Sequence, residues 1–305
     1  MNNPHDKFFK ELFSRKPDVI EFIKSVLPKE IINNIDFSTF KPDVTSYVDT
    51  HLQEHYSDYV YNCNYGDQPV KLAFLFEHKS SVPIYPHFQL LRYFINIQEH
   101  RLRQHYDPMP VIPIIVYHGE RTWYYKSLRE YFSGITEHIA RFLPEFDYLL
   151  IDLSQYTDDQ IRHIFHSTAL SISLLLLKNI FDNRELRANF FRIFDKVPEL
   201  LQKSEGENFF NSILMYLFYG SDLGADYIVH SFQKFSTTGG NIAMSTAEKL
   251  IKKGKQEGIR EGIRKGKQEG IKETARKMIR EGFKIETICK VTGLSQKEVE
   301  ALQKK

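Results

Sequence analysis

The folds open to this chain are limited most by two β-rich runs, at residues 59–64 and 71–76. The turn sequence Tyr65-Gly66-Asp67-Gln68 separates them, so the pair is predicted to form a β-hairpin. The second run is apolar throughout residues 73–76. An unbroken apolar strand is typical of a central strand buried on both faces, whereas a half-exposed strand alternates. The hairpin is therefore expected inside a sheet that helices cover.

The remaining hydrophobic pattern supplies those helices and further strands. Helical spacing predicts one or two helices at residues 5–27, and another at residues 87–106 with Phe88, Leu91, Ile95 and Leu102 on its apolar side. Strands are expected at residues 111–117 and 146–153, and Pro113 within the first indicates a sheet edge or a bulge. After a capping box at Thr157 and Gln160, helices continue to about residue 235. This order predicts a mixed α/β sheet flanked by helices, in a domain spanning residues 1–235.

Composition places the chain in the globular class. Of 305 residues, 42% are hydrophobic, and 24 Phe and 17 Tyr provide material for a large core. No run approaches the roughly 18 to 20 apolar residues of a membrane span, so no membrane association is expected. The polar N-terminus has no export signal, and Cys63 and Cys289 are too far apart in the sequence to suggest a disulfide framework. A cytoplasmic location fits these features.

The C-terminal part of the chain has a different character. Residues 236–247, which begin Ser-Thr-Thr-Gly-Gly, are predicted to be a linker. In residues 248–273 a glycine recurs every fourth position, from Gly254 to Gly270. Glycine costs roughly 1 kcal/mol at each helix position, so this segment is not expected to be a stable isolated helix. Two interpretations remain: a helix that makes the chain a homo-oligomer by self-association, or a frayed linker.

Charge separates the same two parts. Residues 248–305 carry 17 Lys and Arg against 9 Asp and Glu, a net charge of +8, whereas the remaining 247 residues carry −6. A basic tail on an acidic body can hold a polyanion, or it can be a solvated helical surface.

The last segment, residues 274–305, is predicted to be a small helical unit. A helix ends at Gly282, a second occupies residues 285–291, and Ser295 with Glu298 forms the capping box of a third. Two helices joined by a short glycine turn are typical of a helix-turn-helix, which would bind DNA. The same pattern also fits a simple helical packing or dimer module.

One constellation of residues can carry chemistry. Hydrolysis of a phosphodiester needs hard oxygen ligands for a divalent cation, an activated water, and positive charge against the transition state. Glu77 and Lys79 are two residues apart at the end of an apolar strand, so both are expected on one face of the sheet. Across the hairpin, Asp58 is placed to share a cation with Glu77. The backbone carbonyl of His78 is a further potential metal ligand.

Other polar residues have two interpretations each. Asp6 and Glu11 fit a solvated helix N-terminus or a supplement to the site. Asp152 fits a cap or turn as well as a catalytic carboxylate, and His118 with Glu120 fits a hydrogen-bonded loop or a substrate contact. The dipeptide Pro42-Asp43 is discounted, because it comes too early for the hairpin.

Several motifs in one order give the chain a resemblance to a known family. These motifs are the opening run at residues 5–13, Tyr-Ser-Asp-Tyr-Val-Tyr at 56–61, Phe-Glu-His-Lys-Ser-Ser at 76–81, Phe-Gln-Leu-Leu-Arg-Tyr at 88–93, the run at 113–120, the glycine repeats and Thr-Gly-Leu-Ser at 292–295. Together they resemble the Rpn (YhgA-like) recombination-promoting nucleases, also described as putative transposases. The resemblance spans nearly the whole chain.

The resemblance implies a restriction-endonuclease-like fold of the PD-(D/E)XK superfamily. It implies a DNA endonuclease that uses Mg²⁺, or another divalent cation such as Ca²⁺ or Mn²⁺, and promotes recombination or acts on mobile or foreign DNA. Asp58 matches the metal-binding Asp, Glu77 the second carboxylate, and Lys79 the base, where many relatives have Gln. Gln89 matches a polar helix position near the site. Ser57 stands where the superfamily pattern has Pro.

A non-catalytic function is the alternative. In that case the nuclease-like domain has lost activity, and the helical tail binds DNA or drives oligomerisation. The negative net charge of the body favours this alternative, because duplex binding rewards basic surface. The intact set of Asp58, Glu77 and Lys79 favours the enzyme.

Overall fold

The fold was analysed in a computed structural model that describes residues 4–43, 56–77, 84–119 and 121–303. For residues 56–59 and 71–77 it describes the backbone alone. The chain divides into two compact units, Met1–Met244 and Ser245–Lys305, and each is treated by itself.

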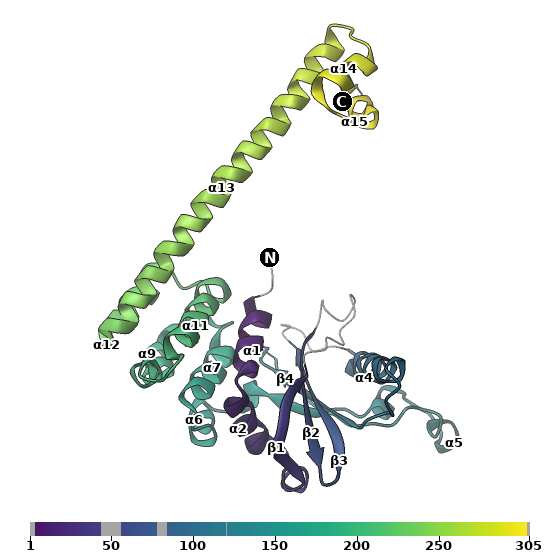
Figure 1. The fold of residues 1–305 in the computed structure, drawn as a ribbon, viewed down its shortest axis with the longest axis vertical. Helices are drawn as coiled ribbons and strands as arrows, with labels where there is room; N and C mark the ends of the chain where they lie inside the picture. Colours follow the sequence, from purple (N-terminus) through teal and green to yellow (C-terminus); the bar gives the residue numbers. More distant parts are fainter. Residues whose placement is uncertain (1–3, 44–55, 78–83, 120, 304–305) are drawn as a thin grey trace. The chain divides into compact units, whose positions relative to one another are not determined.

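A five-stranded mixed sheet forms the centre of the larger unit, with strand order β1-β2-β3-β4-β5 (Figure 1). The strands are β1 (Ile35–Asp43), β2 (Tyr56–Tyr65), β3 (Gln68–Glu77), β4 (Val111–Tyr117) and β5 (Leu149–Asp152). The first three are antiparallel, and β3, β4 and β5 run parallel. The predicted hairpin and the central position of β3 are confirmed. A tight turn joins β2 to β3, and Gly66 adopts a φ of +57° there, which suits glycine.

Strand β1 was not predicted, because its register is irregular. The pairing with β2 shifts between Asp36 and Lys41, so four residues of β1 oppose one of β2. Phe40 is buried and Phe37 is partly buried. Because these two residues are three positions apart, they hide the two-residue alternation that is typical of a strand. Pro113 fits its position in β4, since β4 pairs with β5 only from Ile114 onward.

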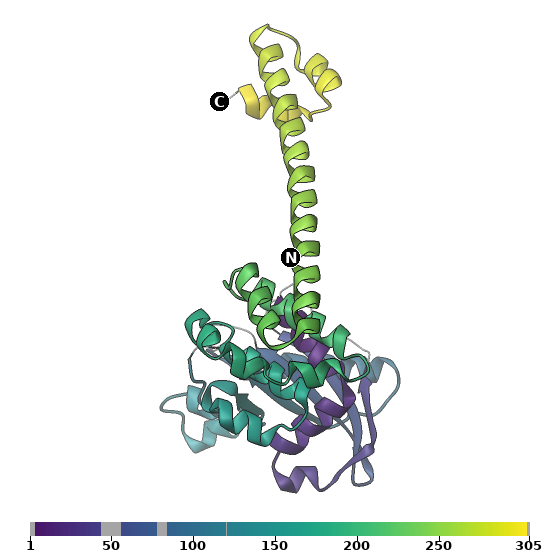
Figure 2. The same ribbon diagram turned by 90° about the vertical axis from the view of Figure 1, so that its left-hand side faces the viewer.

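Helices cover both faces of the sheet, as predicted (Figures 1 and 2). On one face lies a large helical layer, and on the other lies α4 (Pro86–Arg103). The large layer comprises α1 (Pro4–Ser14), α2 (Lys16–Val26), α3 (Lys29–Ile32), α6 (Asp158–Ile164), α7 (Thr168–Asn179), α8 (Asn183–Ala188), α9 (Phe190–Phe194), α10 (Val197–Leu201), α11 (Gly206–Gly220) and α12 (Ala225–Phe235). Short helical turns η1 (Leu128–Tyr131), α5 (Glu137–Ala140) and η2 (Leu153–Gln155) complete the unit. Helix α7 is buried over almost its whole length, as its largely apolar sequence, mixed with serine, indicates.

The buried face of α4 differs from the prediction. Phe88, Ile95 and Leu102 are half exposed, whereas Leu90 and Ile97 are buried against the sheet. Both sides of the helix are apolar, so periodicity alone could not select the one that packs. The buried side is completed by Tyr93 and by His87.

The C-terminal unit consists of α13 (Thr237–Arg280) from Ser245 onward, with α14 (Ile285–Thr292) and α15 (Gln296–Gln303). Ala275, Ile288 and Val299, one from each helix, form its small core. The predicted capping box is present, since the Ser295 backbone N–H donates to Glu298. None of the helices in the described part of the chain combines the length and hydropathy needed to cross a membrane.

Residues 236–247, predicted to be a linker, are helical from Thr237 onward, and the boundary between the two units falls among them, after Met244. The hydroxyl of Ser236 accepts the Gly239 N–H and caps α13. A Cβ at Gly240 would lie 2.4 Å from Gln233, so this glycine permits close packing rather than a flexible link. Ala243 is fully buried on the same side. The glycine-repeat segment also belongs to α13, although it was not expected to be stable as an isolated helix.

His87 makes the smaller core sensitive to pH. The ring is fully buried among Tyr131, Phe146 and Tyr148, and neither nitrogen has a hydrogen-bond partner among the described residues. Burial lowers the pKa of His87, while the Asp147 and Glu130 carboxylates oppose that shift. Between its lowered folded pKa and an unfolded value of about 6.5, the unfolded chain binds more protons.

We therefore expect the stability due to neutral His87 to be present above about pH 6.5 and lost as the pH falls below it. The free energy of unfolding should drop by at most about 1.4 kcal/mol per pH unit on this account. Urea denaturation between pH 7.5 and 5 should show a shallower loss for His87→Leu than for the wild type. The exposed His163→Leu variant is the control. Parallel curves for wild type and His87→Leu would contradict the prediction.

Candidate active site

The candidate site lies at the carboxyl ends of the parallel strands β3, β4 and β5, and we call this end of the sheet the catalytic edge. Glu77 of β3 pairs with Tyr117 of β4, and Tyr117 pairs with Asp152 of β5. On the other side of β3, Glu77 pairs with Tyr56, which begins β2. One row of backbone positions therefore runs across four strands and carries Glu77 and Asp152, about 10 Å apart by strand spacing.

The backbone register places Asp58 and Glu77 in the same alternating set of positions. Asp58 pairs with Leu75, which is two residues before Glu77. Val60 and Tyr117 belong to this set too, and both contribute to the core cluster beneath α4. Directly paired positions and positions two apart share a face of the sheet. Because this face is the one that α4 covers, we call these positions the α4-side set. The register thus meets the requirement that the two acidic positions share one face.

Of the other predicted site residues, the structure describes some and not others. Gln89 lies on α4, the helix that covers the α4-side set, next to the buried Leu90. His78 and Lys79 lie outside the described residues, as does Glu120. Among the described side chains, no group of three His, Cys, Asp or Glu residues could hold a metal ion.

The register places a further carboxylate position, Asp43, in the same set, although the sequence analysis discounted it. Asp43 ends β1 and pairs with Val60, two residues from Asp58, so it also belongs to the α4-side set. The unpredicted strand β1 brings this residue beside the hairpin. Once β1 is recognised as a neighbour of β2, Pro42-Asp43 is no longer too early in the chain to reach the site.

Asp152 acts as a cap. It is buried, and its two carboxylate oxygens accept the backbone N–H groups of Trp123 at 2.8 Å and Ser154 at 2.9 Å. These bonds begin η2 and hold the loop after β4 against the end of β5. The cap interpretation of Asp152 is confirmed.

Next to the edge, His118 follows Tyr117 and turns toward the large helical layer. Its Nδ1 lies 3.0 Å from the Leu177 carbonyl, and its ring stacks on Phe181. His5 of α1 stacks on the same Phe181 ring, and its Nδ1 lies 2.7 Å from the Tyr216 hydroxyl. The predicted loop pair of His118 with Glu120 stays a prediction, because Glu120 lies outside the described residues. The contacts of His118 run instead to the large helical layer, and the stack fixes the start of α1 beside the strand ends.

The acidic residues of α1 differ in their surroundings. Asp6 lies in the first turn of α1 and is 3.7 Å from Lys10, one turn further on. Glu11 is exposed. Both fit a solvated helix face.

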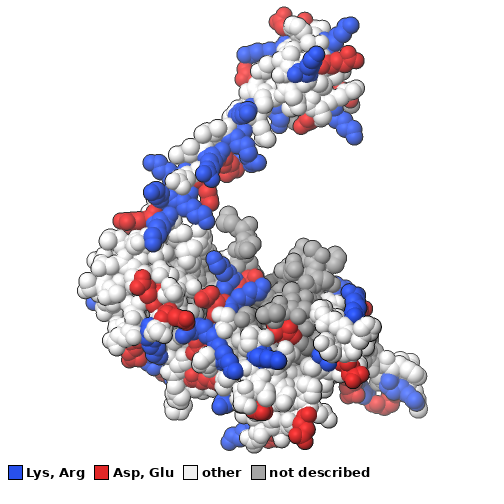
Figure 3. Space-filling model, in the orientation of Figure 1, with Lys and Arg blue, Asp and Glu red and all other residues white. Residues whose placement is uncertain are grey.

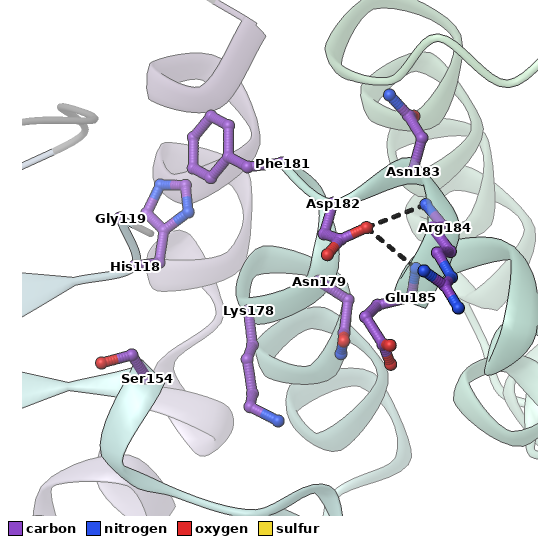
Figure 4. Close-up of a pocket in the computed structure, with 10 residues that line it drawn as sticks. All are labelled: His118, Gly119, Ser154, Lys178, Asn179, Phe181, Asp182, Asn183, Arg184 and Glu185. Atoms are coloured by element: carbon purple, nitrogen blue, oxygen red, sulfur yellow. Dashed lines mark hydrogen bonds between the residues drawn. The ribbon is translucent and has the colours of Figure 1, made fainter. Parts of the chain in front are cut away.

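A pocket of about 640 Å³ opens between the ends of β4 and β5 and the helices α7 and α8 (Figure 4). Its lining residues are His118, Gly119, Ser154, Lys178, Asn179, Phe181, Asp182, Asn183, Arg184 and Glu185. Asp182 caps α8 through the backbone N–H groups of Arg184 and Glu185, and Lys178 pairs with Asp158. Of the motifs found in the sequence, the run at residues 113–120 reaches this pocket through His118 and Gly119. The other lining residues come from separate elements, so no motif marked them.

The chain has two cysteines. Neither Cys63 nor Cys289 forms a disulfide. Burial raises the pKa of the Cys63 thiol to about 11, so this group stays protonated at neutral pH. Cys63 therefore has the inert, buried character that its place in a strand predicts.

Comparison with known proteins identifies the family. The family model "Putative transposase, YhgA-like" matches residues 3–208, about two thirds of the chain. The chain belongs to this family. A second model, "Rpn/YhgA-like nuclease family, C-terminal HTH domain", matches residues 268–304 and confirms the predicted helix-turn-helix unit.

Relatives in the Rpn/YhgA-like family carry both active and inactive names. "Inactive recombination-promoting nuclease-like protein RpnE" of Escherichia coli K12 is 25% identical over 268 residues, covering 86% of each chain. Recombination-promoting nuclease RpnA of the same strain is 33% identical over 162 residues, 52% of this chain and 55% of RpnA. RpnC is 28% identical over 178 residues, 58% of each chain.

No solved structure matches this Rpn/YhgA-like chain. Its architecture is therefore described from its own sheet and helices: a mixed α/β unit, mostly helical, with a helical C-terminal unit.

The capping role of Asp152 gives a stability prediction for this family member. Asp152→Ala leaves the buried N–H groups of Trp123 and Ser154 without their acceptor, which should cost about 2 kcal/mol or more of unfolding free energy. Urea denaturation at pH 7 measures the loss. Asp226→Ala, an exposed aspartate in the first turn of α12, should change stability by less than about 0.5 kcal/mol. Equal effects of the two substitutions would rule out the capping role.

Proposed function

We propose that this protein is a divalent-metal-dependent DNA endonuclease of the PD-(D/E)XK type, with a restriction-endonuclease-like sheet. The observation that carries the proposal is the register of the sheet, in which positions 58 and 77 share the α4-side set at the edge where parallel strands end. Ligand sites in α/β sheets favour that edge. The nuclease names of RpnA and RpnC support the same reaction.

The donor set suits Mg²⁺ or a similar hard cation, since carboxylate and carbonyl oxygens are its preferred ligands. Asp58 and Glu77 would hold the ion, with the backbone carbonyl of His78 as a further ligand. When bound, such an ion lowers the pKa of a coordinated water and offsets phosphate charge. Asp43 is a third carboxylate of the α4-side set that could complete the ligands.

The remaining proposed roles belong to Lys79 and Gln89. An ammonium group at Lys79 would orient the attacking water and stabilise the negative charge that builds on the scissile phosphate. The Gln89 amide, on the helix above the α4-side set, would help to position the water or the phosphate. The names of the family and of RpnA support a biological role in recombination or on mobile DNA. Action on foreign DNA is part of the same proposal.

The alternative is an inactive protein whose C-terminal unit binds DNA or drives oligomerisation. The name of RpnE, which covers most of this chain, favours that alternative. The presence of Asp58, Glu77 and Lys79 together favours activity. The two functions differ in one measurable property, the cutting of DNA.

We expect the purified full chain to nick supercoiled plasmid in the presence of Mg²⁺, Mn²⁺ or Ca²⁺, and to stop when EDTA is added. Asp58→Ala, Glu77→Gln and Lys79→Met should each lower the nicking rate by about 100-fold or more, because each removes a ligand or charge used in the transition state. Asp67→Ala, a carboxylate at the opposite end of the same hairpin, is the matched control and should cut like wild type. Nicking that survives Asp58→Ala, or that needs no metal, would refute the proposal.

We also propose that the chain is a homo-oligomer through the glycine-repeat part of α13. In the monomer a Cβ added at Gly258 or Gly262 meets nothing within 4 Å. Glycine in a helix costs roughly 0.5 to 1 kcal/mol relative to alanine, so five open glycines in a solvent-exposed helix call for another function. Close approach of a second helix is the function that fits them.

Substitution of these glycines separates the two interpretations. If α13 is solitary, Gly258→Ala with Gly262→Ala should raise helix content and leave mass unchanged. If the glycines face a partner helix, the same double variant should weaken self-association by about 10-fold, because the added methyl groups keep the backbones apart. Sedimentation velocity across a concentration series measures this. A chain that stays monomeric at 100 times the assay concentration would end the oligomer proposal.

A further inference from the structure

The exposed part of α13 carries its positive charge on one side. Taking about 100° per residue, Lys249, Lys253, Arg260, Arg264 and Lys267 all fall within a sector of about 60°. Every residue from 249 to 267 that falls in this sector is Lys or Arg, and all five are exposed. We call this set the basic stripe. It extends about 27 Å along the helix at 1.5 Å per residue.

The other sides of the same segment have a different composition. If Lys249 is set at 0° around the helix, the glycines from Gly254 to Gly270 fall between roughly 140° and 300°. On the same angular scale, Ile259 and Ile263 lie among these glycines or beside them. The basic stripe therefore lies away from the glycine side proposed for self-association. Two partners could bind this helix without competing for one face.

Few of the charges in the stripe are neutralised within the C-terminal unit. Among the described residues, Lys253 is the stripe member with an ion-pair partner, Glu257 at 3.8 Å, and that pair is well exposed. Glu257 is also the acidic residue nearest to the sector, about 20° outside it. Figure 3 shows Lys and Arg side chains gathered along this helix.

Beyond the stripe, the same side of α13 packs against the helix-turn-helix unit. Met278 and Ala275 pack with α14 and α15, and they fall at about 20° and 80° on the same angular scale. The helix-turn-helix therefore packs on the side of α13 that bears the stripe. A polyanion held by α14 and α15 would lie on the side of α13 where positive charge is concentrated.

We infer that the basic stripe binds the sugar-phosphate backbone of duplex DNA, next to the helix-turn-helix, and independently of base sequence. Duplex DNA carries one negative charge per about 1.7 Å of axis, so about 27 Å of stripe faces an excess of phosphates. Lysine and arginine at successive turns, with no acidic residue between them in the sector, suit this regular charge. The stripe would hold the DNA substrate while the separate catalytic edge cuts it. This inference takes its ligand class from the proposed function but does not require cleavage.

The test compares two triple variants of the full chain with equal charge. The stripe variant loses three charges from the stripe, through Lys249→Gln, Lys253→Gln and Lys267→Gln. The control variant loses three charges from the other sides of the same segment, through Lys252→Gln, Lys255→Gln and Lys265→Gln. Glutamine and lysine have similar helix propensities, so α13 should keep its helicity, which circular dichroism checks. Binding is measured by fluorescence anisotropy on a random-sequence 30-base-pair duplex in EDTA, so that no cutting occurs, over a range of salt concentrations.

The stripe variant should bind the duplex at least about 10-fold more weakly than wild type at 0.1 M salt. The slope of log affinity against log salt is negative, and its magnitude should be smaller by about 2 to 3 in this variant. The control variant should change the slope by less than about 1. Equal effects in the two variants, or no effect in either, would overturn the inference. The inference would also be overturned if the stripe variant changed single-stranded RNA binding or the sedimentation coefficient while its affinity for duplex DNA stayed unchanged.

Failure of the nuclease proposal would look different. A chain that never nicks plasmid but loses duplex affinity selectively in the stripe variant supports the stripe and refutes the enzyme. A chain whose nicking depends on Asp58, with duplex affinity equal in both triple variants, supports the enzyme and refutes the stripe.

Discussion

The larger unit depends on the pairing of β3 along both of its edges. β3 is antiparallel to β2 over ten residue pairs and parallel to β4 over seven. An antiparallel neighbour needs only a tight turn, whereas a parallel neighbour requires a crossover, and α4 provides it between β3 and β4. The strand must be apolar on both faces to hold this position. Its last residue, Glu77, is the first charged side chain after that run, and it is held where β2 begins and β4 ends.

Two cores of unequal size follow from this arrangement. The large helical layer on one face contributes most of the buried aromatic and aliphatic side chains, and its helix α7 has almost no exposed residue. On the other face, α4 packs through few residues and leaves Phe88 and Ile95 half exposed. The proposed catalytic positions belong to the lightly covered face. A site there can admit a substrate as large as DNA without disturbing the main core.

The sequence predicted most of the regular elements and the hairpin register that puts positions 58 and 77 on one face of the sheet, because alternation, turn residues and capping boxes are local signals. It did not reveal β1, where a shift in register breaks the alternation, and so it discounted Asp43. It selected the wrong side of α4, since two apolar sides compete and only tertiary packing decides. It also assigned Gly240 to a linker, although the small size of this residue serves close contact with Gln233 of α12. The errors at β1 and at α4 concern choices that contacts distant in the sequence make.

The continuity of α13 has a consequence for how this segment can change in length. The basic stripe and the surface that packs α14 and α15 lie on one uninterrupted helix, so helical phase alone fixes the angle between them. Loss or gain of one residue between them would turn one against the other by about 100°, and two residues would turn them nearly to opposite sides. Changes of seven or eleven residues would nearly restore the phase. The number of residues in this helix is therefore under constraint even where their identity is not.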